Sequence, residues 1–348
     1  MYRHTFSKCA VLCLMWSAPL QAWWSMGHRL VGYIGERRLD PQTRVLLEPL
    51  LQQPINAYNA TLTQSLSSFP DAAIWMDEVK NRAIPDLHKN HYINTPLYLN
   101  EIHQTLTRAD VMDRMIRTSA ASPYNVLTCL NWSLYQLAGY FDDQQVTQER
   151  ATALRYLLHL MGDLLQPLHI ISLILPDGQN DEGGNKLRLT QPLEVENLDR
   201  KIQKVEKLHM VWDSILGSIT EDAEHSTTIP RNDRQEVLAQ AYQDLDTKFG
   251  NQPDTDIASI PEWATSLFFV AQTHIYQQIK INLPSKEEKG HIWVELVTSP
   301  SEYKSTVTPV AQQAIWKGGV RLAGLLNTLR VQKFRAPFLQ KQNWARML

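Results

Sequence analysis

Two pairs of side chains in the sequence have the types and spacing of metal ligands. His159 and Asp163 are four residues apart in an apolar stretch, and His209 and Asp213 repeat that spacing further along the chain. Residues four apart project from the same face of an α-helix. Each pair would therefore present an imidazole nitrogen and a carboxylate oxygen side by side, which are donors that zinc accepts.

Three further residues extend this pattern. Pro167 is expected to bend or end the helix that carries Asp163, and so to turn His169 back toward the same place. Asp77 lies in the amphipathic stretch AIWMDEVK, and His91 follows in HYIN. A lone histidine on an apolar face is more often a satisfied core residue than a ligand. Several buried imidazoles and carboxylates need partners, however, and a zinc site would satisfy all of them.

The first 22 residues have the features of a secretory signal peptide. Arg3 and Lys8 precede a mostly apolar stretch at 9–20, and a small residue, Ala22, stands before the expected cleavage point. The stretch is too short for a membrane anchor, which needs about 20 apolar residues. We therefore expect cleavage after Ala22 and a secreted or periplasmic protein without stable membrane insertion.

Cleavage at this point would make Trp23 the first residue of the mature chain. An α-amino group has a pKa of about 8, so a metal ion can readily displace its proton. The amino nitrogen and the carbonyl oxygen of one residue can chelate a cation in a five-membered ring, and His28 follows five residues later. Such a site would exist only after processing, which would link export to activity.

The composition excludes several classes of protein. The 348 residues include 34 Lys+Arg and 36 Asp+Glu, giving a net charge of −2, so the chain is neither disordered nor basic enough to bind a polyanion through bulk charge. Cys9 and Cys13 would leave with the signal peptide, and only Cys129 would remain. A mature chain with one thiol has no internal disulfide, so its stability must come from core burial and metal.

Apolar residues recur at helical spacing in stretches 30–51, 154–165 and 310–326. Alternating strand patterns are nearly absent. The sequence therefore predicts an all-α fold, a single domain of packed helices at 23–330 with at most a short β-ribbon at 187–190. A turn-rich loop is expected at 177–185, a charged connection at 283–290 and a basic C-terminal tail at 331–348.

Six motifs occur in a fixed order along this chain. They are WWSMGH, WMDE, HYIN, ALRYLLHLMGDLLQPLH, GGNK and LHMVWD, and WKGGVRLAGLLN follows near the end. Together they resemble the zinc-dependent single-strand nucleases of the S-one/P-one nuclease family, over residues 23 to about 329. The resemblance implies the all-helical fold that this family shares with bacterial zinc phospholipases C. The short signal peptide and the absence of disulfides favour a bacterial secreted member.

The resemblance also implies a cluster of three Zn²⁺ ions. The first ion would be held by Asp77, His91, His159 and Asp163. The second would take the amino nitrogen and carbonyl oxygen of Trp23, together with His28 and the other oxygen of Asp163. The third would be bound by His169, His209 and Asp213. Asp163 would bridge the first two ions, and Asp77 and Asp163 are the catalytic carboxylates.

The activity implied by the resemblance is cleavage of single-stranded DNA and RNA to 5′-phosphorylated products, with 3′-nucleotidase activity. Two zinc ions about 3.5–4 Å apart can share a hydroxide, which would attack phosphorus. The third ion would stabilise the departing 3′-oxygen. The substrates would be single-stranded nucleic acid and 3′-mononucleotides, and we expect a monomer.

Four residues are candidates for substrate contacts on the same grounds. Lys80, three residues after Asp77, corresponds to a basic residue near the phosphate, and it is a catalytic and substrate-binding candidate; a solvated helix lysine is the alternative. Tyr92 corresponds to an aromatic side chain on which a base stacks, and stacking would favour single strands. Asn94 stands where fungal members carry Asp, so base preference is expected to differ. Asn185 lies in the GGNK loop at the cleft.

The sequence departs from the fungal members in the connection between His169 and His209, which is longer. Its charged segment ENLDRKIQKVEK at 196–207 is expected to form a lid or to lengthen a helix. Two other functions remain open. A zinc phospholipase C would use the same cluster on a lipid phosphodiester, although GGNK, Asp213 and Tyr92 argue against it. A non-catalytic zinc protein would have a closed site with no position for water.

Overall fold

The computed structural model describes residues 23–55, 66–80, 85–196, 202–215, 231–251, 259–282 and 290–331. The predicted signal peptide at 1–22 lies outside these residues, as do the tail beyond residue 331 and nearly all of the connection at 283–290. Lys80 is described by its backbone alone. Within the described residues, no helix is both long enough and apolar enough to span a membrane.

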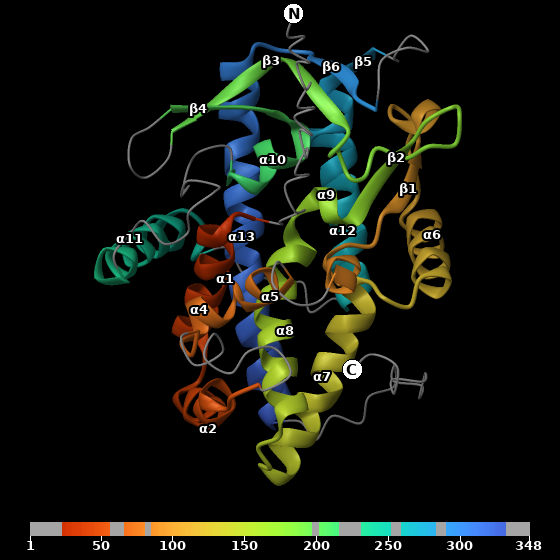
Figure 1. The fold of residues 1–348 in the computed structure, drawn as a ribbon. Helices are drawn as coiled ribbons and strands as arrows, with labels where there is room; N and C mark the ends of the chain where they lie inside the picture. The colour runs from red at the N-terminus through yellow and green to blue at the C-terminus, as the bar shows by residue number, and fades with distance from the viewer. Residues whose placement is uncertain are drawn as a thin grey trace, which may run out of the picture.

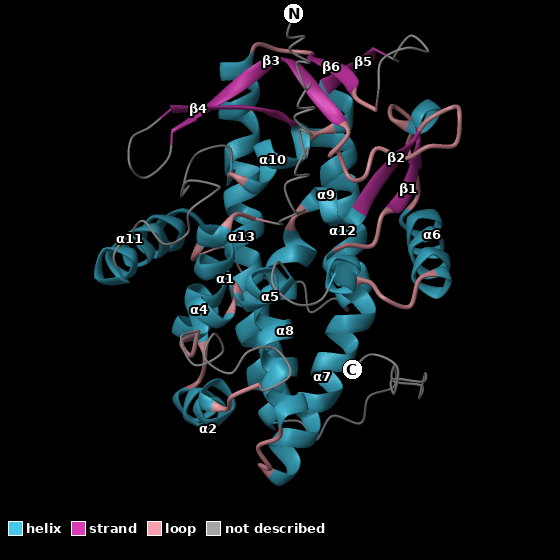
Figure 2. Ribbon diagram, viewed as in Figure 1, coloured by secondary structure: helices cyan, strands magenta, loops and turns pink. Residues whose placement is uncertain are grey.

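Helices make up most of the molecule, as the sequence predicts (Figures 1 and 2). The α-helices of the described residues are α1 (Ser25–Arg38), α2 (Pro41–Gln52), α4 (Phe69–Ala72), α5 (Trp75–Lys80), α6 (Arg108–Ala121), α7 (Val126–Asp143), α8 (Gln148–Leu165), α9 (Pro167–Ile170), α10 (Leu208–Asp213), α11 (Arg231–Phe249), α12 (Ile260–His274) and α13 (Pro300–Val331). Short 3₁₀ helices are η2 (Pro85–His91), η3 (Leu99–Glu101) and η5 (Tyr276–Gln278).

Helix α8 lies at the centre of the bundle, packed against α7, α13 and α1 (Figure 1). The hydroxyl of Thr147 caps its first turn by accepting a hydrogen bond from the backbone N–H of Arg150. Every residue of 151–165 is buried, so this helix is apolar on all faces except where its polar residues meet partners. It ends at Leu165, because Pro167 begins α9 and cannot continue the hydrogen-bonding pattern.

Two sheets lie toward one end of the bundle (Figure 2). Strands β1 (Thr95–Tyr98) and β2 (Ile171–Ile174) pair in parallel, with Thr95 opposite Ile171. The second sheet has the order β4-β3-β6-β5 and is formed by β3 (Leu187–Glu196), β4 (Ile202–Lys207), β5 (Ile279–Asn282) and β6 (Ile292–Leu296). The prediction of helical packing is confirmed, but the strands extend well beyond the expected ribbon at 187–190.

The connection between His169 and His209 accounts for part of this difference. The segment 196–207 was expected to form a lid or to lengthen a helix, and this expectation was wrong. Its described residues end β3 and form β4, which pair antiparallel with Leu193 opposite Val205. Along β3 the buried residues are Leu187, Leu189, Leu193 and Val195, a two-residue alternation that places one face against the core.

Candidate metal centre

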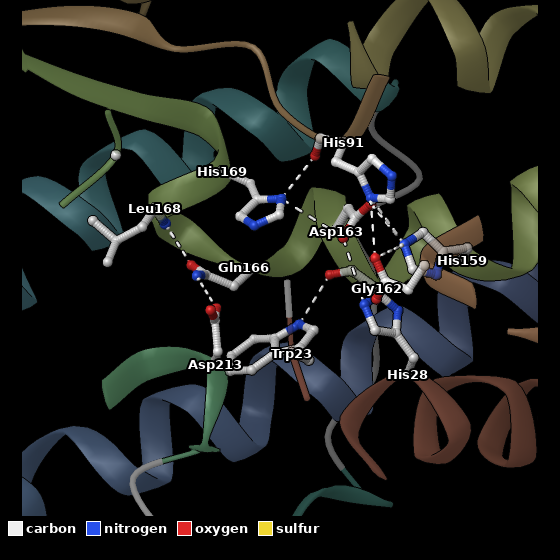
Figure 3. Close-up of polar contacts among 12 residues, drawn as sticks. Trp23, His28, His91, His159, Gly162, Asp163, Gln166, Leu168, His169 and Asp213 are labelled. Carbon is white, nitrogen blue, oxygen red and sulfur yellow. Dashed lines mark hydrogen bonds and ion pairs between the residues drawn. The ribbon is translucent and has the colours of Figure 1, made fainter. Parts of the chain in front are cut away.

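The start of the described chain is fixed beside α8. The indole N–H of Trp23 donates to the carbonyl of Gly162 at 2.9 Å, and the Trp23 side chain is fully buried. The backbone N–H of Trp24 donates to the carbonyl of Asp213 at 2.9 Å. The residue predicted to begin the mature chain therefore lies one helical turn from His159, between α8 and α10 (Figure 3).

Close packing between α1 and α8 brings His28 into the same place. A Cβ atom at Gly162 would lie 2.6 Å from His28 Nδ1, so only glycine admits the ring there. The His28 ring stacks on that of His159 with centroids 3.9 Å apart. Because His28 and Gly162 lie far apart in the sequence, this juxtaposition depends entirely on how the two helices pack.

Asp163 is the residue around which the other polar groups gather (Figure 3). Its Oδ2 atom lies 2.9 Å from His91 Nδ1 and 3.2 Å from His159 Nε2. Its Oδ1 atom lies 3.5 Å from His28 Nε2 and 3.6 Å from His169 Nδ1. The two oxygens thus face different histidines, which is the arrangement that a bridging carboxylate requires.

The remaining side chains complete the groups on either side of Asp163. Asp77 Oδ1 lies 3.9 Å from His159 Nε2 and 4.0 Å from His91 Nδ1. His209 Nε2 lies 3.4 Å from Asp213 Oδ2, and the rings of His169 and His209 have centroids 5.2 Å apart. These contacts join residues from α5, η2, α8, α9 and α10 in one region of the molecule.

Three of these histidines are oriented by backbone carbonyls. His159 Nδ1 lies 2.6 Å from the carbonyl oxygen of Ala73, and His209 Nδ1 lies 2.6 Å from that of Gly183. His169 Nδ1 lies 2.7 Å from the carbonyl oxygen of His91. A carbonyl can only accept, so each Nδ1 carries the proton and each Nε2 presents a lone pair. Metal-binding histidines are commonly held in this way.

The protonation states favour cation binding. Burial, reinforced by the neighbouring His159, lowers the pKa of His28 to about 3. Burial, reinforced by His169, lowers the pKa of His209 to about 3. Both imidazoles are therefore neutral near neutral pH. Burial opposes ionisation of Asp163, yet the imidazoles of His159 and His91 hold its pKa well below the usual range, so it is charged.

The donor set fits divalent ions of the zinc type. Within the described chain, three groups of histidines and aspartates could each hold a metal ion. They are His28–His159–Asp163, Asp77–His91–His159 and His169–His209–Asp213, and their ligand atoms lie within 4.8 Å of one another. In the same described residues, both nitrogens of His28 and Nε2 of His209 are buried without a hydrogen bond. Buried polar atoms of this kind need a partner, and a metal ion would supply it.

The structure brings together all eight side chains that the sequence singles out as ligands, and these eight form the metal centre discussed below. Beside it lies a cleft of about 340 Å³, lined in part by His91, His169 and His209. Tyr92, Asn94 and Asn185 also line this cleft, as expected for substrate contacts. Tyr92 is half-buried, and burial raises its pKa, with Glu182 adding to the shift. The Lys80 side chain lies outside the described residues.

Several residues at the cleft were not singled out from the sequence. His88, Asn180 and Glu182 also line it. Gln166 was missed as well: its side-chain amide donates to Asp213 Oδ1 at 2.7 Å, and its carbonyl accepts from the backbone N–H of Leu168 at 2.6 Å. Gln166 thereby fixes both the start of α9 and the orientation of Asp213. Its place directly before Pro167 was the available signal, since this is a helix-capping position.

Asp181 is a second residue that sequence reasoning missed. Its buried carboxylate accepts hydrogen bonds from the backbone N–H groups of Gly183 and Gly184 and from the hydroxyls of Ser172 and Tyr276. Gly183 has φ +59°, and a Cβ there would lie 2.4 Å from a backbone oxygen, so the turn requires glycine. The carbonyl of Gly183 in turn orients His209. Asp181 therefore positions His209 through the glycine turn.

Comparison with known proteins agrees with this geometry. The family model described as S1/P1 Nuclease matches residues 23–330. The chain belongs to the S1/P1 nuclease family. It is 28% identical to Endonuclease 2 of Arabidopsis thaliana, over 94% of this chain and 97% of that protein.

Two fungal enzymes of the S1/P1 nuclease family are more distant. Nuclease P1 of Penicillium citrinum is 22% identical over 88% of this chain and 97% of its own length. Nuclease S1 of Aspergillus oryzae is 22% identical over 89% and 92%, respectively. Membership of this family confirms the predicted resemblance and makes the protein a nuclease, a phosphodiester hydrolase. The family is metal-dependent, in keeping with the three His/Asp groups.

Proposed function

We propose that the protein is a zinc endonuclease that cleaves single-stranded DNA and RNA to 5′-phosphorylated products and also removes phosphate from 3′-mononucleotides. The observation that carries the proposal is Asp163, whose two oxygens face different histidines among three candidate metal-binding groups. The donor atoms are neutral imidazoles and carboxylates, which suit zinc. Three ions would occupy the three groups, with Asp163 shared between two of them.

Divalent ions held there supply a nucleophile from water and offset the negative charge that builds up on phosphorus. The protein's own residues do the rest. The carbonyls of Ala73, Gly183 and His91 hold three imidazoles in the tautomer that presents Nε2. Low pKa values keep His28 and His209 unprotonated, so no ligand repels the incoming metal.

Tyr92 supports the preference for single strands. The ring is half-buried in the wall of the cleft, directly after the candidate ligand His91. A base that stacks on it must present its face, and a duplex covers that face. Asn94 and Asn185 line the same cleft and offer both donors and acceptors to a base or a phosphate.

A panel of substrates tests the proposal and its nearest alternative. Purified protein is incubated with denatured DNA, RNA, 3′-AMP and phosphatidylcholine vesicles, each with and without a chelator. We expect chelator-sensitive hydrolysis of the first three substrates. Hydrolysis of the vesicles alone would instead identify a zinc phospholipase C, and zinc binding without hydrolysis would identify a non-catalytic zinc protein.

We further propose that the protein is exported, cleaved after Ala22, and completed as an enzyme by the amino group of Trp23. The burial of Trp23 beside Gly162 supports this proposal. Secreted protein is compared with protein made in the cytosol with one extra residue before Trp23. We expect the secreted form to begin at Trp23 and to hold about one more zinc ion per chain than the extended form. Equal zinc content in both forms would rule out the amine as a ligand.

A further inference from the structure

A second cavity, of about 300 Å³, lies between α1, α2, α4 and α11 and shares no lining residue with the cleft. In Figure 1, α11 lies beside α1 and α4 at the side of the bundle. Four arginines line this cavity, and we refer to it as the arginine cavity. They are Arg29, Arg37, Arg44 and Arg234. The acidic residues of the lining are Glu36 and Asp71.

The charge of the arginine cavity is opposite in sign to that of the whole protein. Four guanidinium groups against two carboxylates give its lining a formal excess of two positive charges. The full chain has a net charge of −2. Positive charge in this molecule is therefore concentrated locally, where low-dielectric walls strengthen its field.

Arg29 forms the buried floor of the cavity. Its side chain is only 4% exposed, and its Nε atom donates to Asp71 Oδ1 at 3.2 Å. The other carboxylate oxygen of Asp71 accepts a hydrogen bond from the Ser68 hydroxyl at 2.7 Å. These contacts fix the guanidinium in place, and a fixed group loses little conformational entropy when it binds an anion.

Arg37 and Arg44 stand at the exposed rim on either side of the Glu36 carboxyl. Arg44 pairs with Glu36 at 2.9 Å, whereas Arg37 donates to the neutral hydroxyl of Tyr33 at 3.1 Å. Both arginines act on Glu36 electrostatically, although its burial is the larger influence and raises its pKa. Glu36 therefore cannot neutralise both rim arginines, and Arg234 adds a further positive charge from α11.

We propose that the arginine cavity binds a phosphate group, carried by a nucleic-acid strand or present as inorganic phosphate. Guanidinium groups bind phosphate oxygens through paired, charge-assisted hydrogen bonds. A buried, fixed arginine below two exposed ones allows a tetrahedral anion to enter from solvent and reach the floor. Strand binding rests on the proposed nuclease function, whereas binding of inorganic phosphate does not.

The competing interpretation is that these charges only hold the four helices together. In that case the ion pairs Arg29–Asp71 and Arg44–Glu36 would be structural, and the cavity would have no affinity for anions. The two interpretations differ in one measurable property, which is the binding of phosphate by the rim arginines.

Calorimetry with inorganic phosphate on the zinc-loaded protein is the first test. The variant is Arg37→Gln/Arg44→Gln, which alters only exposed side chains. The matched control is Arg108→Gln/Arg117→Gln, which removes two exposed arginines paired with Glu262 and Asp113 elsewhere on the surface. We expect the wild type and the control to show phosphate binding beyond that of the metal centre. In the rim variant this extra binding should weaken at least about tenfold.

The second test separates the two sources of phosphate. KM is measured for oligothymidylates of increasing length with the same three proteins. If the cavity binds a strand, KM of the rim variant rises several-fold for long substrates only. Its dependence on salt should also become shallower, by about 0.7 per lost contact. If the cavity takes inorganic phosphate, calorimetry changes and KM does not.

Identical phosphate binding in the wild type and the rim variant would overturn the proposal. Equal thermal denaturation temperatures of all three proteins would show that the fold is intact. Should no strand be hydrolysed at all, the proposed nuclease function fails. The calorimetric comparison still decides whether the arginine cavity binds phosphate.

Discussion

Adjacent residues of α1 serve two polar regions of opposite character. His28 packs against Gly162 and faces Asp163 in the metal centre, whereas Arg29 pairs with Asp71 in the arginine cavity. The metal-binding groups consist of neutral imidazoles and carboxylates, and the arginine cavity has more guanidinium than carboxylate groups. One helix can thus bury donors for a cation on one face and donors for an anion on another. Each region is completed by an ion of the opposite sign.

The largest effect is expected for Asp163→Ala, which removes the carboxylate that the metal-binding groups share. Turnover should fall below detection, and the protein should lose about two zinc ions per chain, because two ions lose a ligand at once. Zinc content by elemental analysis and hydrolysis of denatured DNA measure both. Glu149→Ala, at an exposed position on the same helix, is the control. Full zinc content with retained activity in Asp163→Ala would defeat the model of the centre.

Gly162→Ala tests the packing that brings His28 to the centre. The added Cβ would lie 2.6 Å from His28 Nδ1, so the ring must move away from Asp163. We expect a loss of about 1–3 kcal/mol in the free energy of unfolding, together with weaker zinc binding. Gly324→Ala on α13 is the control, because a Cβ there meets no atom within 4 Å. Equal zinc affinity in both variants would show that α1 is not positioned by this contact.

Asp181→Asn tests a positioning residue that contacts no proposed ligand directly. The amide would oppose the backbone N–H groups of Gly183 and Gly184, and the carbonyl that orients His209 would shift. Zinc affinity should fall by about 10–100-fold for one ion, as is typical when such supporting groups are lost. Zinc titration with a chelating competitor measures this. Asp177→Asn, exposed in the same loop, should leave the affinity unchanged.

The pH dependence of stability should also distinguish the two regions. In the unfolded chain histidines take up protons below about pH 6.5. In the folded, metal-free protein His28 and His209 do so only near pH 3. The unfolded state therefore binds more protons across that window, and the free energy of unfolding should decrease as the pH falls through it. The guanidinium groups stay charged throughout and contribute no slope.

Denaturant titrations of chelator-treated protein at several pH values measure this slope. The variant His28→Gln should show a shallower dependence, because one of the two titrating groups is gone. A free energy of unfolding that does not change across the window would contradict the assignment of these histidines as buried and neutral.

The smallest effect is expected for Asn94→Asp, which changes one group in the wall of the cleft. Asn94 has φ 55°, a conformation that both residue types tolerate, so the fold should be unaffected. An amide both donates and accepts, whereas a carboxylate only accepts, so relative rates on the four homopolymers should change by a few-fold. Asn100→Asp, at an exposed position, is the control. Identical homopolymer profiles would remove Asn94 from base recognition.

Part of the centre could be predicted because it is local in the chain. The four-residue spacings of His159 with Asp163 and of His209 with Asp213 place each pair on one helix face, and the structure has both pairs on helices. Pro167 ends α8 as expected and allows His169 to turn toward Asp163. The mostly helical fold also follows from periodicity, which depends on neighbouring residues alone.

Other features depend on contacts between distant segments. The sheet formed by β3, β4, β5 and β6 was underestimated because β3 pairs with β6 from a segment about a hundred residues away. Asp181 binds Tyr276, and Arg29 meets Arg234 at the arginine cavity, across similar separations. No local pattern records such pairings.

The sequence alone determined which residues can bind a cation, which helix faces carry them and to which family the motifs belong. Tertiary structure decided that α1 approaches α8 closely enough at Gly162 for His28 to face Asp163. It also decided that four arginines gather around one cavity. The physical reason is that helix periodicity is set by hydrogen bonds four residues apart, whereas the meeting of helices is set by the packing of the whole core.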